Sequence, residues 1–292
     1  MPHSPDDDLA TFEALRPELT ALGYRMLADL GRAQELVQEA WLRWHQRDVE
    51  VHSPRAFLLT TVSRLCLNEL GSARARREES RSDRLPEPVD LASYGLERVV
   101  ALEQVSIAFM RVLERLTPSE RAVLLLHDVF DFAHEEIGSL LERSPSSSRK
   151  LLERAKSKVG TGRRTISASR EEHRRLLDAF LHAVSAGDLE QLVALLAEDA
   201  TIITDGGATG RRVGRTRNLP RPLRGARRVA TFLLQSARST ELVVEHRELN
   251  GHPGVVFRRH GAPFAALQLE IADSKIAQIF FHADLTRLGH VD

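Results

Sequence analysis

Apolar residues recur at three- and four-residue steps through the first 77 residues, which is the periodicity of amphipathic helices. One apolar stripe consists of Leu15, Leu19, Leu22, Met26 and Leu30. A second helix is predicted over about 33–44. A third is predicted from residue 55 to about 75, after an N-cap serine and a first-turn proline at Ser53-Pro54. The pattern therefore predicts an all-helical domain over residues 1–80.

The helical pattern stops after this domain and then resumes. Polar residues 78–83 and the prolines of Leu85-Pro86-Glu87-Pro88 cannot continue a helix, so 81–96 is predicted to be a linker. Helical periodicity returns over 97–160, where Thr117-Pro118 has the form of an N-cap followed by a first-turn proline. Residues 161–169 are rich in Gly, Ser and Thr and predict a second linker.

Residues 170–292 have a different pattern. Two helical stretches at about 171–186 and 188–197 precede an extended run at 200–204, and another helix is predicted over about 225–238. Four β-like stretches follow, at 241–249, 255–259, 264–271 and 275–282. Helices followed by a run of strands indicate an α+β domain. The chain is therefore predicted to hold two all-α domains and then an α+β domain.

The distribution of charge along the chain is uneven, although the net charge is zero. The 292 residues carry 41 basic and 41 acidic side chains, so the formal net charge is zero. By segment, however, residues 1–140 carry −8, 141–170 carry +7, 171–210 carry −6, 211–240 carry +9 and 241–292 carry −2. Alternating blocks of this size indicate modules with different partners.

Several protein classes are excluded by composition. No run approaches the roughly 18 apolar residues of a membrane span. The acidic start lacks the apolar region of a secretory signal, and the single cysteine, Cys66, cannot form a disulfide framework or a CxxC motif. We expect a cytoplasmic protein without a metal site or cofactor.

The strongest functional pattern is a pair of short helices over about 132–158. Ser144 is placed to cap the second helix and Pro145 stands in its first turn. This is the arrangement of a helix-turn-helix, whose second helix enters the major groove of DNA. An ordinary basic helix pair on a solvated surface is the alternative, but the +7 block favours DNA. The predicted DNA-binding residues here are Ser146, Ser147, Arg149, Lys150, Arg154 and Lys158.

The order of these motifs resembles a group of extracytoplasmic-function sigma factors of RNA polymerase that carry a fused SnoaL-like C-terminal domain. Residues 32–44 are similar to the helix of sigma region 2 that binds the polymerase clamp, and residues 63–78 to the helix that reads the −10 element. Leu85-Pro86-Glu87-Pro88 matches the short proline motif of this group. Residues 113–121 and the helix-turn-helix match region 4, which reads the −35 element.

The resemblance implies two further sets of site residues in region 2. Arg64, Asn68, Ser72, Arg74, Arg76 and Arg77 would contact the −10 element. Glu35, Gln38, Glu39, Arg43 and Trp44 would contact core polymerase, whereas Trp41 is expected to fill the core. Without the resemblance, the arginines could equally form a solvated helix end stabilised by the helix dipole.

The chain departs from the family pattern at four positions of the sigma regions. Asn68 stands where Asp is common, and Gly71 where Arg is common, which weakens the helix by about 1 kcal/mol. Glu142 occupies a turn position that usually holds glycine because it often needs positive φ. Ser148 stands where an apolar residue usually packs.

The C-terminal domain resembles the SnoaL-like branch of the NTF2-like cone fold. Asp205-Gly206-Gly207 matches a regulatory motif of this sigma group, although Ala208-Thr209 follows in place of Gly-Lys. His282-Ala283-Asp284 stands where the group tends to have Asn-Pro-Asp. A loop over 211–228 holds eight arginines and no acid. This loop is either a solvated segment or a contact for acidic residues or promoter phosphates.

These observations predict a sigma factor with core RNA polymerase and promoter DNA as partners and no enzymatic activity of its own. Its C-terminal domain is expected to modulate transcription, and a small ligand in that domain is left open. One alternative is a SnoaL-like cyclase or hydrolase fused to a DNA-binding region, with Asp205 and His246, His260 or His282 as acid and base. A second alternative is a helix-turn-helix repressor that acts without polymerase.

Overall fold

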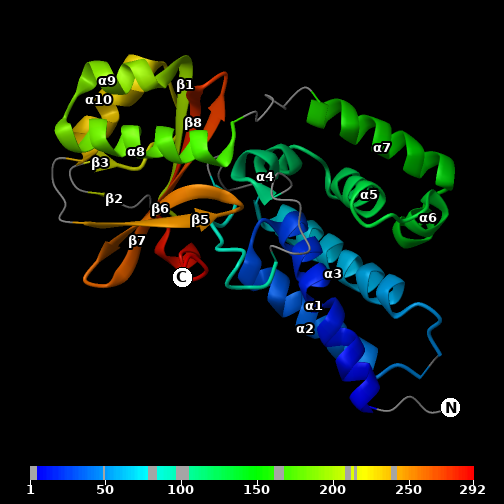
Figure 1. Cartoon of the computed structure of the whole chain (residues 1–292). Helices are drawn as coiled ribbons and strands as arrows, with labels where there is room; N and C mark the ends of the chain where they lie inside the picture. The colour runs from blue at the N-terminus through cyan, green and yellow to red at the C-terminus, as the bar shows by residue number, and fades with distance from the viewer. Residues whose placement is uncertain are drawn as a thin grey trace. The chain divides into compact units, whose positions relative to one another are not determined.

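The computed structural model describes residues 5–48, 50–77, 84–96, 105–160, 168–207, 212–213, 216–237 and 242–292. The chain divides into two compact units (Figure 1). Unit 1 contains residues 1–80, 94–105 and 109–163, and unit 2 contains residues 81–93, 106–108 and 164–292. Residues 84–93, expected as part of a linker between helical domains, therefore belong structurally with the C-terminal part of the chain.

Unit 1 begins with three packed helices: α1 (Pro5–Leu27), α2 (Leu30–His45) and α3 (Pro54–Arg77). Asp29 caps α2, since its carboxylate accepts a hydrogen bond from the backbone N–H of Arg32 at 3.0 Å. Of the two tryptophans of α2, Trp44 is fully buried, whereas Trp41 is half-buried and packs on Phe12 with ring centroids 4.9 Å apart. Trp44, predicted to face a partner, is therefore the more buried of the two, and Trp41, predicted to fill the core, is only half-buried.

The described residues of unit 1 also form α4 (Ile107–Glu114, whose first two residues count with unit 2), α5 (Pro118–Asp128), α6 (His134–Leu141) and α7 (Pro145–Gly160). The predicted cap at Thr117 is confirmed and forms a full capping box. Thr117 Oγ1 accepts from the N–H of Glu120 at 3.3 Å, and the Glu120 carboxylate accepts from the N–H of Thr117 at 2.9 Å. Residues 97–104, predicted to be helical, lie outside the described residues.

Buried guanidinium groups join the two helical groups of unit 1. Arg121 on α5 donates from Nε to the carbonyl of Leu113 at 2.9 Å and from Nη1 to the carbonyl of Met26 near the end of α1. Arg25 lies 5.9 Å from the centroid of the Phe130 ring, and burial lowers its pKa to about 10. Because a buried arginine must keep its partners, these contacts hold α5 against α1.

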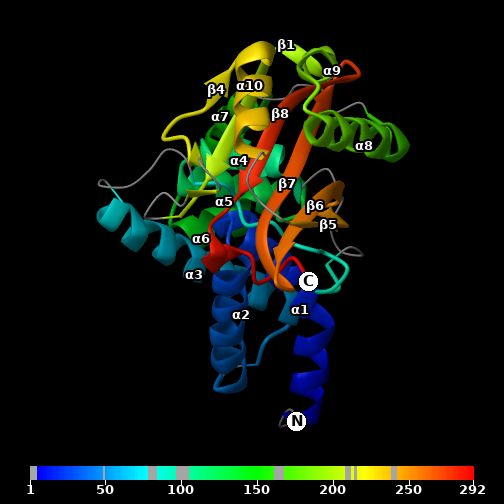
Figure 2. The same ribbon diagram turned by 90° about the vertical axis from the view of Figure 1, so that its left-hand side faces the viewer.

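Unit 2 is built around a six-stranded sheet. Its helices are α8 (Arg170–Ala186), α9 (Leu189–Leu195) and α10 (Ala226–Ala237). Its strands are β1 (Leu196–Asp205), β4 (Leu223–Arg224), β5 (Val243–Leu249), β6 (His252–Arg259), β7 (Ala262–Ala272) and β8 (Lys275–His282). The strand order is β4-β1-β8-β7-β6-β5, with β1 parallel to β8 (Figure 2). The short β2 (Arg212–Val213) and β3 (Thr216–Arg217) pair separately, and a 3-10 turn, Leu285–Arg287, follows β8.

The predicted fold class, all-α domains followed by an α+β domain, is confirmed. Strand β1 begins at Leu196, earlier than the predicted 200, because its first residue already pairs with Ile276 across an irregularity in register. Strands β5, β6, β7 and β8 agree with the predicted ones to within a few residues, since alternation and turn residues mark their ends. The two-residue strands β2, β3 and β4 lie within the arginine-rich loop and were not predicted.

Both faces of this sheet are covered. On one face, Leu267, Leu269 and Ile279 pack with apolar residues of α8, α9 and α10. The intervening residues of neighbouring strands point to the opposite face, because side chains alternate along a strand. There Ile203 and Phe280 form a buried cluster with Leu85 and Ile107. The opposite face is therefore covered by two segments from the middle of the chain.

The turn of the helix-turn-helix carries backbone strain. Glu142 adopts φ 55°, ψ 45°, the left-handed conformation suspected from the sequence. This conformation costs a residue with a Cβ about 1–2 kcal/mol. We expect Glu142→Gly to raise the free energy of unfolding by about 0.5–1 kcal/mol, since the greater freedom of the unfolded glycine offsets part of the gain. Urea unfolding measures this, and an equal gain from Glu142→Ala would contradict it, because alanine keeps the Cβ.

Candidate functional site

The turn between α6 and α7 is tightly packed. A Cβ added at Gly138 would lie 2.7 Å from the carbonyl oxygen of Arg143, so the turn comes directly against α6 at this glycine. Ser144 caps α7 as predicted, since its Oγ accepts from the N–H of Ser147 at 3.2 Å. The second helix is thus held at its first turn, the part of a helix-turn-helix that approaches base edges.

Ser148, at a position where an apolar residue was expected, is completely buried. Its hydroxyl lies 2.9 Å from Nδ1 of His134 on α6, so the buried oxygen has a hydrogen-bond partner. The His134 ring stacks on His127 with centroids 4.7 Å apart, and burial, with the neighbouring His127, lowers the pKa of His134. A polar pair therefore replaces apolar packing between the two helices.

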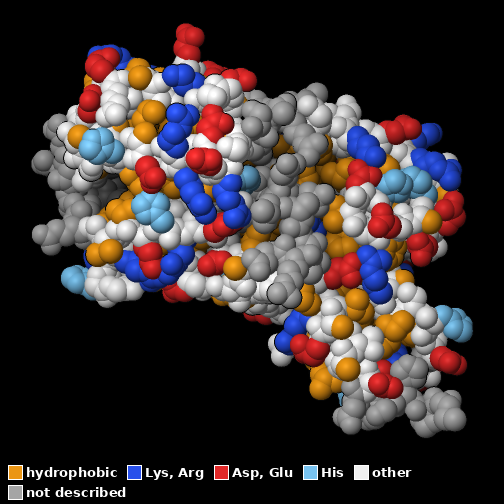
Figure 3. Space-filling view, in the orientation of Figure 1, with side chains coloured by type: hydrophobic (Ala, Val, Ile, Leu, Met, Phe, Trp, Pro, Cys, Tyr) orange, Lys and Arg blue, Asp and Glu red, His pale blue; other side chains and the backbone are white. Residues whose placement is uncertain are grey.

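Ion pairs within the protein already engage half of the predicted DNA-contacting cations of α7. Arg149 pairs with Glu135 at 3.2 Å, and Lys158 pairs with Glu120 at 2.7 Å. Lys150 and Arg154 are exposed and make no ion pair with the described residues. Figure 3 shows acidic and basic side chains interspersed over the part of unit 1 that contains α5, α6 and α7. The cations most available to phosphates are thus Lys150 and Arg154.

Ser146 and Ser147 lie in the first turn of α7, as predicted for residues that approach bases. Ser146 is exposed, and its hydroxyl lies 3.0 Å from that of Ser144. The backbone N–H of Ser147 is used by the cap. These short side chains present hydroxyl groups at the end of the helix where the macrodipole also favours anions.

The predicted −10-reading residues lie along α3. Arg64 and Asn68 are exposed, four residues apart and therefore on one face. Ser72 continues this face, and its hydroxyl donates to the backbone carbonyl of Glu69 at 3.0 Å. A Cβ added at Gly71 would meet nothing within 4 Å, so the family's larger residue would fit there. The side chains of Arg74, Arg76 and Arg77 lie outside the described residues.

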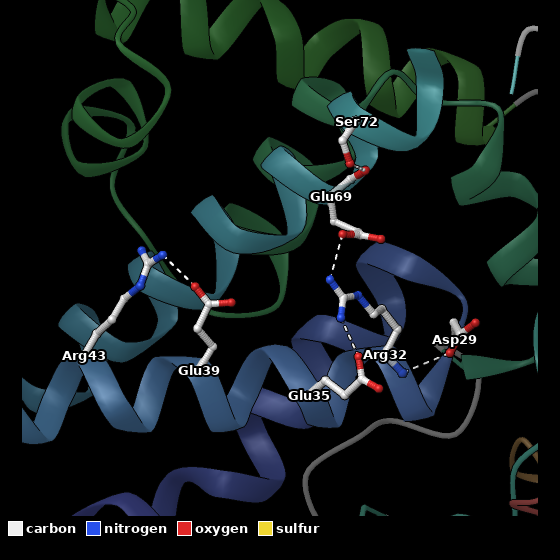
Figure 4. Close-up of polar contacts among 7 residues, drawn as sticks. All are labelled: Asp29, Arg32, Glu35, Glu39, Arg43, Glu69 and Ser72. Atoms are coloured by element: carbon white, nitrogen blue, oxygen red, sulfur yellow. Dashed lines mark hydrogen bonds and ion pairs between the residues drawn. The ribbon is translucent and has the colours of Figure 1, made fainter. Parts of the chain in front are cut away.

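Three of the predicted polymerase-contacting residues of α2, Glu35, Glu39 and Arg43, make ion pairs in two separate groups (Figure 4). Arg32, which the sequence did not single out, pairs with Glu35 on α2 and with Glu69 on α3, the latter at 2.9 Å. Hydrogen bonds from Glu69 and Glu35 raise the pKa of Arg32. Further along α2, Arg43 pairs with Glu39 at 2.7 Å.

Gln38 is exposed on the same helix, whereas Trp44 is in the core. The expectation that the Trp44 side chain faces a partner is therefore corrected, because the ring lies between helices and packs on Phe57 with centroids 5.6 Å apart. Leu42, 52% exposed, and the half-buried Trp41 are the apolar side chains that α2 presents instead.

The proline motif is bound within unit 2 rather than exposed. Leu85, Glu87 and Val89 are 1%, 3% and 0% exposed. The N–H of Leu85 donates to Oδ2 of Asp205 at 2.9 Å, and Arg287 donates to the carbonyl of Leu85. Val89, four residues after Leu85, is bound by Asn250 through both of its backbone groups. Its N–H donates to Oδ1 of Asn250 at 3.1 Å, and its carbonyl accepts from the N–H of Asn250 at 2.8 Å. Both ends of the segment 85–89 are thus fixed by the C-terminal part of the chain.

Asp205 is the centre of this binding site. Its second oxygen accepts from the N–H of Gly207 at 3.0 Å, and its carboxylate lies 3.8 Å from Arg287. Gly207 has φ 72°, and a Cβ there would lie 2.7 Å from Cγ of Asp284. The two C-terminal motifs therefore contact one another. Asn250 and Arg287 were missed from the sequence, since nothing in their spacing links them to residue 85.

Of the residues considered for catalysis, only Asp205 and His282 are neighbours on adjacent strands. Asp205 is buried and occupied by hydrogen bonds to the backbone. His282 lies opposite it in the β1–β8 register, but His246 pairs with Asp178 at the surface, 3.0 Å away, and His260 is in the exposed turn after β6. The described residues contain no group of three or more side chains that could hold a metal ion.

The arginine-rich loop is only partly described. The side chains at 211–217 lie outside the described residues, as does Ala208-Thr209. Arg221, Arg224, Arg227 and Arg228 are exposed, and Arg227 pairs with Glu190 at 3.1 Å.

Among the helices of the described residues, none combines the length and the apolar composition that a membrane-spanning helix requires.

Comparison with known proteins gives matches that cover most of the chain. The family model "Sigma-70 region 2" matches residues 11–76, and "Sigma-70, region 4" matches residues 106–159. The chain is 35% identical to the ECF RNA polymerase sigma factor SigJ of Mycobacterium tuberculosis H37Rv, covering 94% of this chain and 90% of SigJ. It is 31% identical to the probable ECF RNA polymerase sigma factor SigI of Mycobacterium tuberculosis CDC 1551, covering 92% and 91% of the two chains. The crystal structure of Mycobacterium tuberculosis SigJ superposes with a TM-score of 0.73 at 29% identity, covering 96% of this chain and 97% of that one.

Proposed function

The chain belongs to the extracytoplasmic-function RNA polymerase sigma factors, and from this premise we propose that its C-terminal domain regulates initiation by binding the segment that connects the two sigma regions. Its general role is that of the family: directing RNA polymerase to promoters. We further propose that α3 reads the −10 element and α7 the −35 element, in the cytoplasm where polymerase acts. The exposed residues of α2 would contact core polymerase.

The observation that carries the regulatory proposal is the binding of residues 85–89 by Asp205, Asn250 and Arg287. Twenty-nine residues separate the end of α3 at Arg77 from the start of α4 at Ile107. If all were free, they could span roughly 100 Å at 3.3–3.6 Å per residue. Leu85 and Ile107 are held in one buried cluster with Ile203 and Phe280, so residues 78–84 would be the part of the connection left free to extend. The C-terminal domain would thereby limit how far apart regions 2 and 4 can move.

The contacts inside unit 1 support the same proposal. Arg121 on α5 bonds the carbonyl of Met26 on α1, so regions 2 and 4 are packed together. Reading two promoter elements at once requires the two regions to separate along the DNA. Release of the segment 85–89 would favour that separation, and binding of the segment would oppose it.

We propose that the C-terminal domain performs no catalysis. Asp205 supports this, because it is buried and each of its carboxylate oxygens accepts a hydrogen bond from a backbone N–H group, which gives it a structural role in holding Leu85 and Gly207. A cyclase or hydrolase would instead turn over a small carbonyl substrate, and Asp205→Ala would abolish that turnover.

Run-off transcription with purified core polymerase tests the proposal. The template is a promoter upstream of the protein's own operon, and the full chain is compared with a chain truncated near residue 165. We expect a promoter-specific transcript, with outputs that differ at least about fivefold between the two chains, the lower end of usual coupling energies. No transcript from either chain would contradict the assignment to this promoter, and equal output would contradict regulation by the C-terminal domain.

A further inference from the structure

A small cavity lies within unit 2, between the sheet and residues 106–108. Its volume is about 20 Å³, enough for one water-sized group such as a hydroxyl. Ser106, Ile107 and Ala108 line one side, and the other side is formed by side chains of β7, β8, β6 and α8. All of these residues belong to unit 2. Gln268 of β7 and Phe280 of β8 are register partners and lie on the sheet face opposite the helical core.

Two residues that line this cavity carry polar atoms that their surroundings leave unbonded. His173 and Gln268 are each 3% exposed. Nε2 of His173 and Oε1 of Gln268 are buried and have no hydrogen-bond partner in the described part of the chain. The orientation of the Gln268 amide is determined, because its Nε2 donates to the carbonyl of Leu249 at 2.8 Å. Leaving such groups unbonded costs roughly 1–3 kcal/mol each.

The lining contains one acidic side chain, the buried Glu270, and otherwise neutral groups, so it disfavours an anionic ligand and suits a hydroxyl group. Burial, together with the neighbouring His252, lowers the pKa of His173 to about 4, so its ring is neutral at pH 7. The His173 and His252 rings stack with centroids 5.4 Å apart and an interplanar angle of 18°, which presents a flat aromatic surface. The remaining lining includes the side chain of Glu270 and the apolar side chains of Ile107, Leu269, Ile271 and Phe280. A hydroxyl can donate to Gln268 Oε1 and also bond a neutral histidine.

Ile107 determines how large a ligand can be. It is 2% exposed and packs with Leu85, Ile203 and Phe280. With Ile107 in place, only a hydroxyl-sized group fits, whereas removal of its side chain would open an apolar space beside the two polar atoms. Ile107 is also the first residue of α4, which leads into region 4.

We propose that this cavity is a binding site for a small uncharged molecule with a hydroxyl group on an apolar, planar body. Its hydroxyl bonds His173 and Gln268, and its body takes the place of the Ile107 side chain. Binding therefore detaches the start of α4 from the sheet. This inference rests on the regulatory function proposed above for the C-terminal domain, and it names the class of effector that would act there. Binding of such a molecule can be tested without measuring transcription.

Phenol and benzene form a matched pair of probes for the full-length chain carrying Ile107→Ala, with folding checked by circular dichroism. We expect phenol to bind this variant about tenfold more tightly than benzene, the difference made by one hydrogen bond. In the double variant with Gln268→Leu the preference should fall to about threefold or less. Calorimetry or thermal shift measures both.

Two results would overturn the proposal: equal binding of phenol and benzene to Ile107→Ala, or binding of neither by the folded variant. In the unmodified chain, phenol should speed amide hydrogen exchange at residues 105–110, and unchanged exchange at saturating phenol would exclude displacement of Ile107. Thr231→Ala, an exposed change on α10, is the control and should leave each measurement unaltered. Because these are binding measurements, a negative result would contradict the ligand site while promoter-directed transcription by the same chain was retained.

Discussion

Replacing Asp205 by alanine is expected to free the proline motif and to destabilise unit 2 by about 3 kcal/mol. The change leaves the buried N–H groups of Leu85 and Gly207 without acceptors. It also removes the carboxylate 3.8 Å from the buried Arg287. Limited proteolysis should show new cleavage over residues 84–91, and urea unfolding gives the loss of free energy.

Two other variants sharpen this test. Asp205→Asn keeps one carbonyl oxygen as an acceptor, so we expect a smaller loss and partial protection of residues 84–91. Glu198→Ala removes an exposed carboxylate from the same strand and should change neither measurement. If Asp205→Ala left the proteolysis of residues 84–91 unchanged, the carboxylate would not be what holds the segment.

The double substitution of Lys150 and Arg154 by alanine is expected to weaken promoter binding about 10- to 50-fold at 0.1 M salt. These are the two exposed cations of α7 without an ion pair among the described residues. For every phosphate that the variant no longer neutralises, the slope of log affinity against log salt should fall by about one. Fluorescence anisotropy with a labelled fragment from upstream of the protein's own operon measures both quantities.

Lys156→Ala is the matched control for this pair. It lies on the same helix and is exposed, but its ammonium is paired with Asp128 at 3.0 Å. We expect less than a threefold loss of affinity, because binding DNA through Lys156 would first require breaking that ion pair. If Lys156→Ala cost half as much binding free energy as the double substitution of Lys150 and Arg154, the ion pairs would not be what determines which cations bind phosphate.

The local pattern of the chain was sufficient to predict most of its elements. The capping box at Thr117, the cap at Ser144 and the strand at 275–282 lie where the sequence indicated, because caps and alternation act over a few residues. The positive φ at Glu142 was also foreseeable, since the turn of a helix-turn-helix needs it whatever residue is present.

The exposure of the α2 tryptophans and the ion pairs of the α7 cations depended on residues far away in the sequence. The relative burial of Trp41 and Trp44 was predicted incorrectly, because both lie on the apolar side of one helix and only packing against α1 and α3 decides which is enclosed. Whether a cation of α7 is available depends on acids such as Glu120, 38 residues away, which helical periodicity does not reveal.

The sequence by itself therefore determined the order of the domains, the family and the positions of the motifs, since each rests on residues close together in the chain. Only the tertiary structure showed that the proline motif, read as a linker, is buried against the sheet by Asp205, Asn250 and Arg287. These partners are 120 to 202 residues away from the segment that they hold. Hydrogen bonds across such separations form only after the sheet and its returning C-terminal turn have folded.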